Sequence, residues 1–181
     1  MSAIDPIRFA FPARVLHWLM AVLIVAMLFI GVGMISTASP TYPLLLSWHR
    51  PLGIAIVVLA LVRLIVRLTH RAPPLPADLP MIQVLAAKGS HYLLYAAMIA
   101  MPLLGWAMLS AAGSPVQMWP GFVLPPILPH SALIFGWLRW AHGVIGYLFF
   151  ALILAHLGAA LFHGLVRRDG VLGSMASFKA R

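Results

Sequence analysis

The sequence contains no cysteine, and this absence limits the ways in which the chain could hold a cofactor. Without cysteine it forms no disulfides, ligates no iron–sulfur cluster through thiolates and lacks the C-x-x-C-H attachment motif. Acidic residues are almost as scarce, since only Asp5, Asp78 and Asp169 occur among 181 residues. All three lie outside the apolar segments, so we expect neither carboxylate catalysis nor a carboxylate proton relay within a membrane.

Charge of either sign is scarce as well. Only 8% of the residues are charged and 63% are hydrophobic, whereas about a quarter of the residues of a soluble domain are charged. Four apolar segments reach the roughly 20 residues that a membrane-spanning helix needs. We therefore expect an all-α integral membrane protein, a four-transmembrane-helix bundle forming a single domain over residues 1–181, with helices at 15–35, 48–68, 91–109 and 140–165.

The basic residues predict the orientation of this bundle. Ten of the twelve lie at the N-terminus, around the second connection or at the C-terminus: Arg8, Arg14, Arg63, Arg67, Arg71, Lys88, Arg167, Arg168, Lys179 and Arg181. The first and third connections carry only Arg50 and Arg139. By the positive-inside rule both termini face the cytoplasm, as in a multi-pass protein of a bacterial inner membrane. The net charge of +9 therefore comes from residues in short segments beside the membrane. We expect membrane lipid as their partner, and we expect no binding of nucleic acid.

Residues 110–139 form the longest predicted connection. They are apolar, but five prolines interrupt them, so a fifth span is not expected. We expect the segment at the membrane interface, with Trp119 and Trp137 at headgroup depth.

Eight histidines are unusual in so apolar a chain. A single histidine in a membrane helix commonly serves helix packing, but here number and position favour metal ligation. His142 and His156 are fourteen residues apart, which gives about 21 Å of rise and about 40° around the helix axis. One helix can therefore present two imidazoles to the same side at two depths, as two haems stacked across a bilayer require.

Each haem also needs an imidazole from a facing helix. His49 is the other histidine at a periplasmic helix end, so it is the expected partner of His142. On the cytoplasmic side four histidines compete for two positions: His17, His91, His156 and His163. The fourteen-residue spacing favours His156 with His17, although His163 matches the depth of His17 better. Ligation by two imidazoles leaves iron no open position and suits electron transfer.

Two further features bear on this prediction. Gly53 and Gly146 each follow a predicted ligand by four residues, where they could give a flat macrocycle room or serve ordinary small-residue packing. Zinc is the alternative metal, but structural zinc gathers its ligands closely, whereas these histidines divide between two membrane faces.

Six motifs carry a resemblance to a known family: R-V-L-H-W at 14–18, W-H-R-P-L-G at 48–53, V-R-L-I-V-R-L at 62–68, G-S-H-Y-L-L-Y at 89–95, W-A-H-G-V-I-G-Y at 140–147 and H-L-G-A-A-L-F-H at 156–163. In this order, over nearly the whole chain, they resemble the bacterial cytochrome b561 family. The resemblance implies two haem b groups that exchange electrons with the quinone pool. It implies that His17 and His156 hold the cytoplasmic haem iron and that His49 and His142 hold the periplasmic one.

The resemblance also implies candidate activities. His91 and His163 match family histidines. One activity described in the family is superoxide oxidation with ubiquinone as acceptor, which would make the chain a superoxide:ubiquinone oxidoreductase. Other relatives are cytochrome subunits of hydrogenases and formate dehydrogenases.

The leading functional hypothesis is therefore electron transfer between a periplasmic small-molecule or protein donor and membrane ubiquinone. Quinone or haem propionates could contact His91, His163, Arg67 and Arg71. Arg50 and Arg139 each lie within three residues of a predicted ligand, where they could pair with propionates or attract an anion such as superoxide. No residue is expected to act as a catalytic base or nucleophile.

Two other functions remain open from the sequence. The chain could be a cytochrome b anchor subunit that relays electrons for a separate dehydrogenase or hydrogenase, with 110–139 as its docking surface. It could also be a non-redox small membrane protein or transporter, although we detect no inverted repeat and no acidic residue within the spans.

Overall fold

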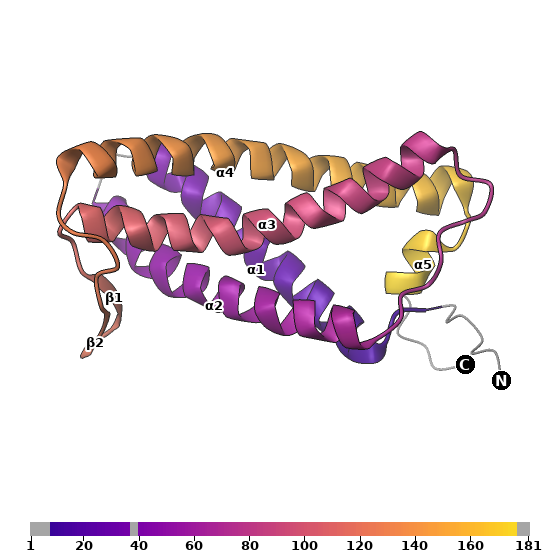
Figure 1. Cartoon of the computed structure of the whole chain (residues 1–181), viewed down its shortest axis with the longest axis horizontal. Coiled ribbons are helices and arrows are strands. Elements are labelled where there is room, and N and C mark those ends of the chain that lie inside the picture. Colours follow the sequence, from indigo (N-terminus) through magenta and orange to yellow (C-terminus); the bar gives the residue numbers. More distant parts are fainter. Residues whose placement is uncertain (1–7, 37–39, 177–181) are drawn as a thin grey trace.

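Four long helices form an elongated bundle in the computed structural model of the protein, which describes residues 8–36 and 40–176 (Figure 1). The helices are α1 (Phe11–Ser36), α2 (Thr41–Thr69), α3 (Met81–Ala111) and α4 (Ala132–Leu161). Each is long and apolar enough to cross a membrane, with α4 counted through Arg167. The predicted four-helix transmembrane architecture is thereby confirmed.

The helices extend beyond the spans that the apolar runs predicted. α3 begins at Met81 rather than at residue 91, and α4 begins at Ala132 rather than at residue 140. The thickness of the membrane's hydrocarbon core determines only how long the apolar part of a helix must be. The first residue of the helix depends on capping instead. At the start of α4 the Ser131 hydroxyl accepts a hydrogen bond from the Ile134 amide at 3.4 Å. The third connection is therefore shorter than expected, and Trp137 and Arg139 belong to α4.

That connection folds as a small hairpin. Strands β1 (Val116–Trp119) and β2 (Phe122–Leu124) pair antiparallel, and the rings of Trp119 and Phe122 stack at 4.5 Å. The segment after the hairpin is tied to α3: Trp106 Nε1 donates to the carbonyl of Pro125 at 2.9 Å, and the Ile127 amide donates to Ser110 Oγ at 3.1 Å. We call this the hairpin end of the bundle.

At the opposite end the chain turns back on itself. α4 continues into one π-helical turn, η1 (Phe162–Arg167), then Arg168 adopts a left-handed conformation with φ 53°, and α5 (Val171–Ala176) follows. The carbonyl of Ser174 accepts from the Phe9 amide at 3.2 Å, and that of Met175 accepts from Trp18 Nε1 at 3.3 Å. α5 is thus fastened beside the start of α1, and we call this the α5 end (Figure 1).

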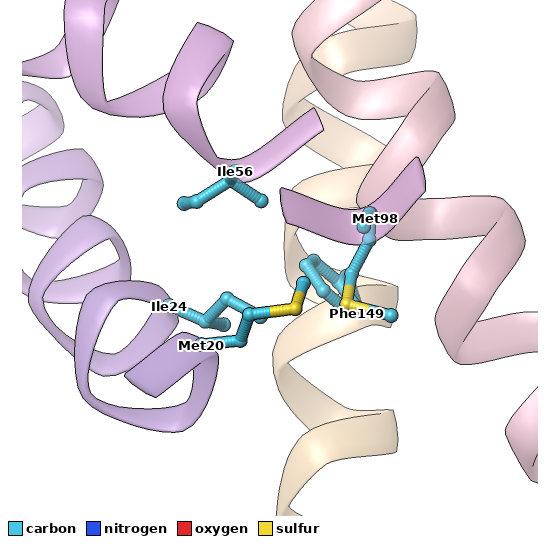
Figure 2. Close-up of a cluster of buried hydrophobic side chains, with 6 residues drawn as sticks. Met20, Ile24, Ile56, Met98 and Phe149 are labelled. Atoms are coloured by element: carbon cyan, nitrogen blue, oxygen red, sulfur yellow. The ribbon is translucent and has the colours of Figure 1, made fainter. Parts of the chain in front are cut away.

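The best-buried side chains form one layer between the two ends. Figure 2 shows this core layer: Met20 and Ile24 from α1, Ile56 and Ala60 from α2, Met98 from α3 and Phe149 from α4. Most other large apolar side chains are exposed on the outside of the bundle. Such an exterior suits lipid, in which helix association depends on close packing rather than on hiding apolar surface.

Candidate functional site

Two histidines face each other at the hairpin end. His49 of α2 and His142 of α4 have ring centroids 6.1 Å apart, with planes inclined by 61°. The Nδ1 atom of each ring is buried and has no hydrogen-bond partner among the described residues. Buried polar atoms normally have a partner, so a ring pair with two unpaired nitrogens is a candidate for binding another group.

The spacing of these rings fits a metal centre. A metal between two imidazole nitrogens needs about 2 Å on each side, and each ring centre lies about 1 Å behind its nitrogen, which gives a centroid separation of roughly 6 Å. The separation of 6.1 Å between His49 and His142 meets this requirement. Imidazoles are established ligands of haem iron. Two imidazole nitrogens at this spacing would therefore fit a haem iron bound by both rings.

Three histidines lie near one another toward the α5 end. The ring of His156 on α4 is 6.2 Å from that of His17 on α1 and 5.4 Å from that of His91 on α3. The separation of 6.2 Å from His17 fits a bridging metal, while the ring of His91 is closer to His156 than that spacing requires. Across residues 8–36 and 40–176, no three histidine or acidic side chains are grouped as metal ligands. The geometry here therefore supports a pair with His91 beside it.

His163 does not join that group. Its Nδ1 lies 2.6 Å from Asp169 Oδ2, and the same carboxylate oxygen accepts from Arg167 Nε at 2.9 Å. Arg167 Nη2 donates in turn to Asp78 at 2.7 Å. His163 is the second residue of the π turn, and its ring contacts the carboxylate that follows that turn. The structure thus directs His163 toward Asp169, whereas the sequence left it as a competing ligand.

The charge state of Asp169 follows from its surroundings. Burial alone would raise the pKa of its carboxyl group, but hydrogen bonds from two side chains and from the Val171 amide outweigh burial. They hold the pKa of Asp169 below its usual range, so the group is a carboxylate at neutral pH.

A glycine of α3 lies against the hairpin-end pair. The space beside Gly53 and Gly146 contains methionine side chains, with Met27 Cε 3.7 Å and Met101 Cε 3.5 Å from the position of an added Cβ. Gly105 of α3 instead lies against the ligand candidate itself, because its Cβ would stand 3.4 Å from Cε1 of His142. The sequence offered no signal for this contact between α3 and α4.

The core layer separates the two histidine groups. Phe149 follows His142 by seven residues and precedes His156 by seven, which places it about 10 Å along α4 from each. The same interval relates three other members of the layer to histidines: Ile24 to His17, Ile56 to His49 and Met98 to His91. In each of the four helices, seven residues, or about two helical turns, separate a histidine from a residue of the core layer. The two histidine groups therefore lie at different depths with the packed apolar layer between them.

Arg63 is the functional candidate that sequence reasoning missed. It lies inside α2, where its Nη1 donates to the carbonyl of Ala13 at 2.9 Å and its side chain also hydrogen-bonds Tyr95. Its charge acts on the three imidazoles grouped toward the α5 end. The sequence reasoning used Arg63 only to predict the orientation of the bundle. A cation inside an apolar run is itself a sign of a functional position, and this signal could have identified Arg63.

The other predicted basic residues are dispersed. Arg50 is half-buried, and its Nε has no hydrogen-bond partner within the described part of the chain. Arg139 is exposed beside a shallow depression on α4 between Trp140 and Tyr147. Arg67 and Arg71 are exposed at the α5 end, and the guanidinium of Arg67 lies 6.0 Å from the ring centre of Phe9.

A membrane-spanning helical bundle whose facing imidazoles are spaced to hold iron has the architecture of a membrane cytochrome. The chain belongs to the prokaryotic cytochrome b561 family, whose model matches residues 8–178. It is 32% identical to cytochrome b561 homolog 1 of Escherichia coli (strain K12) over 91% of this chain and 94% of the relative. It is also 32% identical to the probable superoxide oxidase CybB of Yersinia pestis, over 87% of this chain and 89% of the relative. Cytochrome b561 homolog 2 of E. coli is 27% identical over 94% of this chain and 92% of the relative.

Membership of this family implies that the chain binds haem b and transfers electrons in a membrane. The prediction of a b-type membrane cytochrome is confirmed at this level, and the non-redox alternative is set aside.

Proposed function

We propose that this chain is a di-haem cytochrome that carries electrons from a periplasmic donor to ubiquinone in the bacterial inner membrane. The observation that supports it best is that one helix, α4, carries His142 and His156, each about 6 Å from an imidazole of another helix. His49 and His142 would hold one haem iron, and His17 and His156 the other. When bound, the haems supply one-electron redox chemistry, and the chain positions them at two depths.

The orientation of the bundle supports the direction of transfer. The excess of lysine and arginine around the α5 end supports a cytoplasmic α5 end and a periplasmic hairpin end. The haem between His49 and His142 would then receive electrons from the periplasm. The haem beside His156 would pass them to quinone, with His91, His163, Arg67 and Arg71 as candidate contacts for quinone or propionates.

Superoxide is our candidate donor. The relative from Yersinia pestis bears the name probable superoxide oxidase. Arg50 and Arg139 are the only charged residues between positions 15 and 62 and between 89 and 166. They lie in the hairpin-end half of the bundle, and both described acids, Asp78 and Asp169, lie at the α5 end. An anion approaching the hairpin end therefore meets an uncompensated positive field, which raises its rate of encounter.

Superoxide-driven haem reduction tests this proposal. Wild type should reduce its haems and then form ubiquinol from added ubiquinone. Arg50→Ala and Arg139→Ala should each slow haem reduction at low salt and resemble wild type at high salt, where the field is screened. Rates equal to wild type at low salt would refute electrostatic steering, and a wild type that superoxide fails to reduce would refute superoxide as donor.

An anchor-subunit role is the second candidate, and the hairpin favours it. Trp119, Phe122 and Val123 keep between 43% and 57% of their surface exposed at its tip. These side chains could contact a separate dehydrogenase. Co-purification of a second chain in mild detergent, lost on Trp119→Ser, would support this role over transfer by the chain alone.

A further inference from the structure

We propose that Arg63 binds a propionate carboxylate of the haem toward the α5 end, the one that His17 and His156 would hold. This inference rests on the proposed function, because it concerns one of the two haems assumed there. Haem b carries propionate groups, and a carboxylate inside an apolar bundle is costly unless a cation or several hydrogen-bond donors lie beside it. A haem site between membrane helices therefore needs such a group within reach.

The position of Arg63 along α2 places it at the depth of the α5-end histidines. Arg63 follows His49 by fourteen residues, which is also the interval from His142 to His156 on α4. Fourteen residues give about 21 Å of rise and about 40° around the helix axis. Arg63 therefore lies on nearly the same face of α2 as His49 but far from it in depth, so we expect it to serve only the haem toward the α5 end.

Contacts with two other helices hold the guanidinium inside the bundle. Its Nη1 donates to the carbonyl of Ala13 on α1 at 2.9 Å, and the side chain also hydrogen-bonds Tyr95 on α3. Ala13 precedes His17 by four residues. Tyr95 likewise follows His91 by four residues, so each partner of Arg63 lies about one helical turn from a histidine of the group.

Arg63 has more donors than these contacts use. A guanidinium presents a planar fork of N–H groups, and a single carbonyl and a phenol do not occupy all of them. In the described part of the chain only Asp78 and Asp169 are acidic, and both hydrogen-bond Arg167 at the α5 end. A cation within an apolar span normally has a partner of opposite charge. A carboxylate that accepts two parallel N–H bonds is the partner that suits this fork best.

The charge of Arg63 also acts on the ligands themselves. It affects the imidazoles of His17, His91 and His156, which come from three different helices. The guanidinium is therefore close to all sides of the place that a haem between His17 and His156 would take. A propionate of that haem would find Arg63 beside it.

Isotope-edited infrared spectroscopy of the haem-loaded protein tests this inference. Cells supplied with aminolevulinate that carries ¹³C in its carboxyl group make haem with labelled propionate carboxyls. Subtracting the spectra of labelled and unlabelled protein then leaves the bands of those carboxylates. In Arg63→Gln these bands should shift relative to wild type, because a neutral amide lacks the charged pair of N–H donors. Arg63→Lys should also shift them, because an ammonium group makes no planar pair of parallel bonds.

Lys88→Gln is the matched control, because it removes one positive charge from an exposed side chain of α3 near the same end. Its labelled bands should match those of wild type. Each Arg63 variant is also combined with His142→Ala, which should retain only the haem toward the α5 end, and the shift should persist there. Unshifted bands in both Arg63 variants would overturn the inference, as would a shift that disappears with His142→Ala.

The haem content per chain distinguishes failure of the inference from failure of the proposed function. Two haems in wild type together with unshifted bands in both variants contradict only the role of Arg63. One haem in wild type contradicts the di-haem proposal itself. Arg63→Lys keeps a cation at this depth, so the comparison still decides the question if Arg63→Gln loses its haem.

Discussion

Replacing Gly105 by valine should expel the haem at the hairpin end while leaving the other haem in place. An added Cβ at Gly105 stands 3.4 Å from Cε1 of His142, which is ordinary contact, so Gly105→Ala should retain both haems. A γ-methyl extends roughly 1.5 Å further toward the ring, although carbon atoms pack no closer than about 3.5 Å. The imidazole must then move by more than about 1 Å, whereas a metal–ligand bond tolerates about 0.2 Å.

The assay is haem per chain by pyridine haemochrome, with the reduced-minus-oxidised spectrum of each variant. Wild type and Gly105→Ala should each contain two haems, and Gly105→Val should contain one. Gly143→Val is the matched control, since it makes the same change next to His142 at a glycine with nothing within 4 Å of its added Cβ. Two haems with an unaltered spectrum in Gly105→Val would refute the reasoning that this ring is held in place against α3.

Arg63→Gln should lower the reduction potential of the haem toward the α5 end, because a nearby cation favours the reduced form; a redox titration with two unshifted midpoints would contradict this. Phe149→Ala should cost roughly 3–5 kcal/mol by opening a cavity in the core layer while retaining both haems, and an unchanged thermal midpoint by circular dichroism would argue against the layer as a packed core. Gly164→Ala should loosen α5, because a Cβ there would collide with Leu172; hydrogen exchange at the Ser174 amide should then rise, and unchanged protection would count against close packing there.

Hydropathy was sufficient to predict the four helices, because lipid requires each crossing to be apolar and internally hydrogen-bonded. It could not predict where the helices begin, since capping by residues such as Ser131 lies outside the apolar runs. The positions of the histidines along the helices were enough to predict that His49 lies near His142. These are the only two histidines in predicted spans near the hairpin end.

The histidines at the other end show where sequence reasoning fails. A helix wheel places His156 and His163 on the same face of α4 and gives no indication that His163 lies beside Asp169. Periodicity also could not separate His17 from His91, because both face His156 from different helices. The roles of Gly105 and Arg63 depend on contacts between helices, and no local pattern encodes them.

We propose that two haem b groups are held at two depths by paired histidines of the bundle. The most direct test is a dithionite-reduced minus oxidised spectrum of purified protein, with haem quantified per chain, in wild type, His49→Ala and His142→Ala. We expect two b haems in wild type and one in each variant, with the same haem lost from both. A single haem in wild type, or two haems retained in both variants, would contradict it.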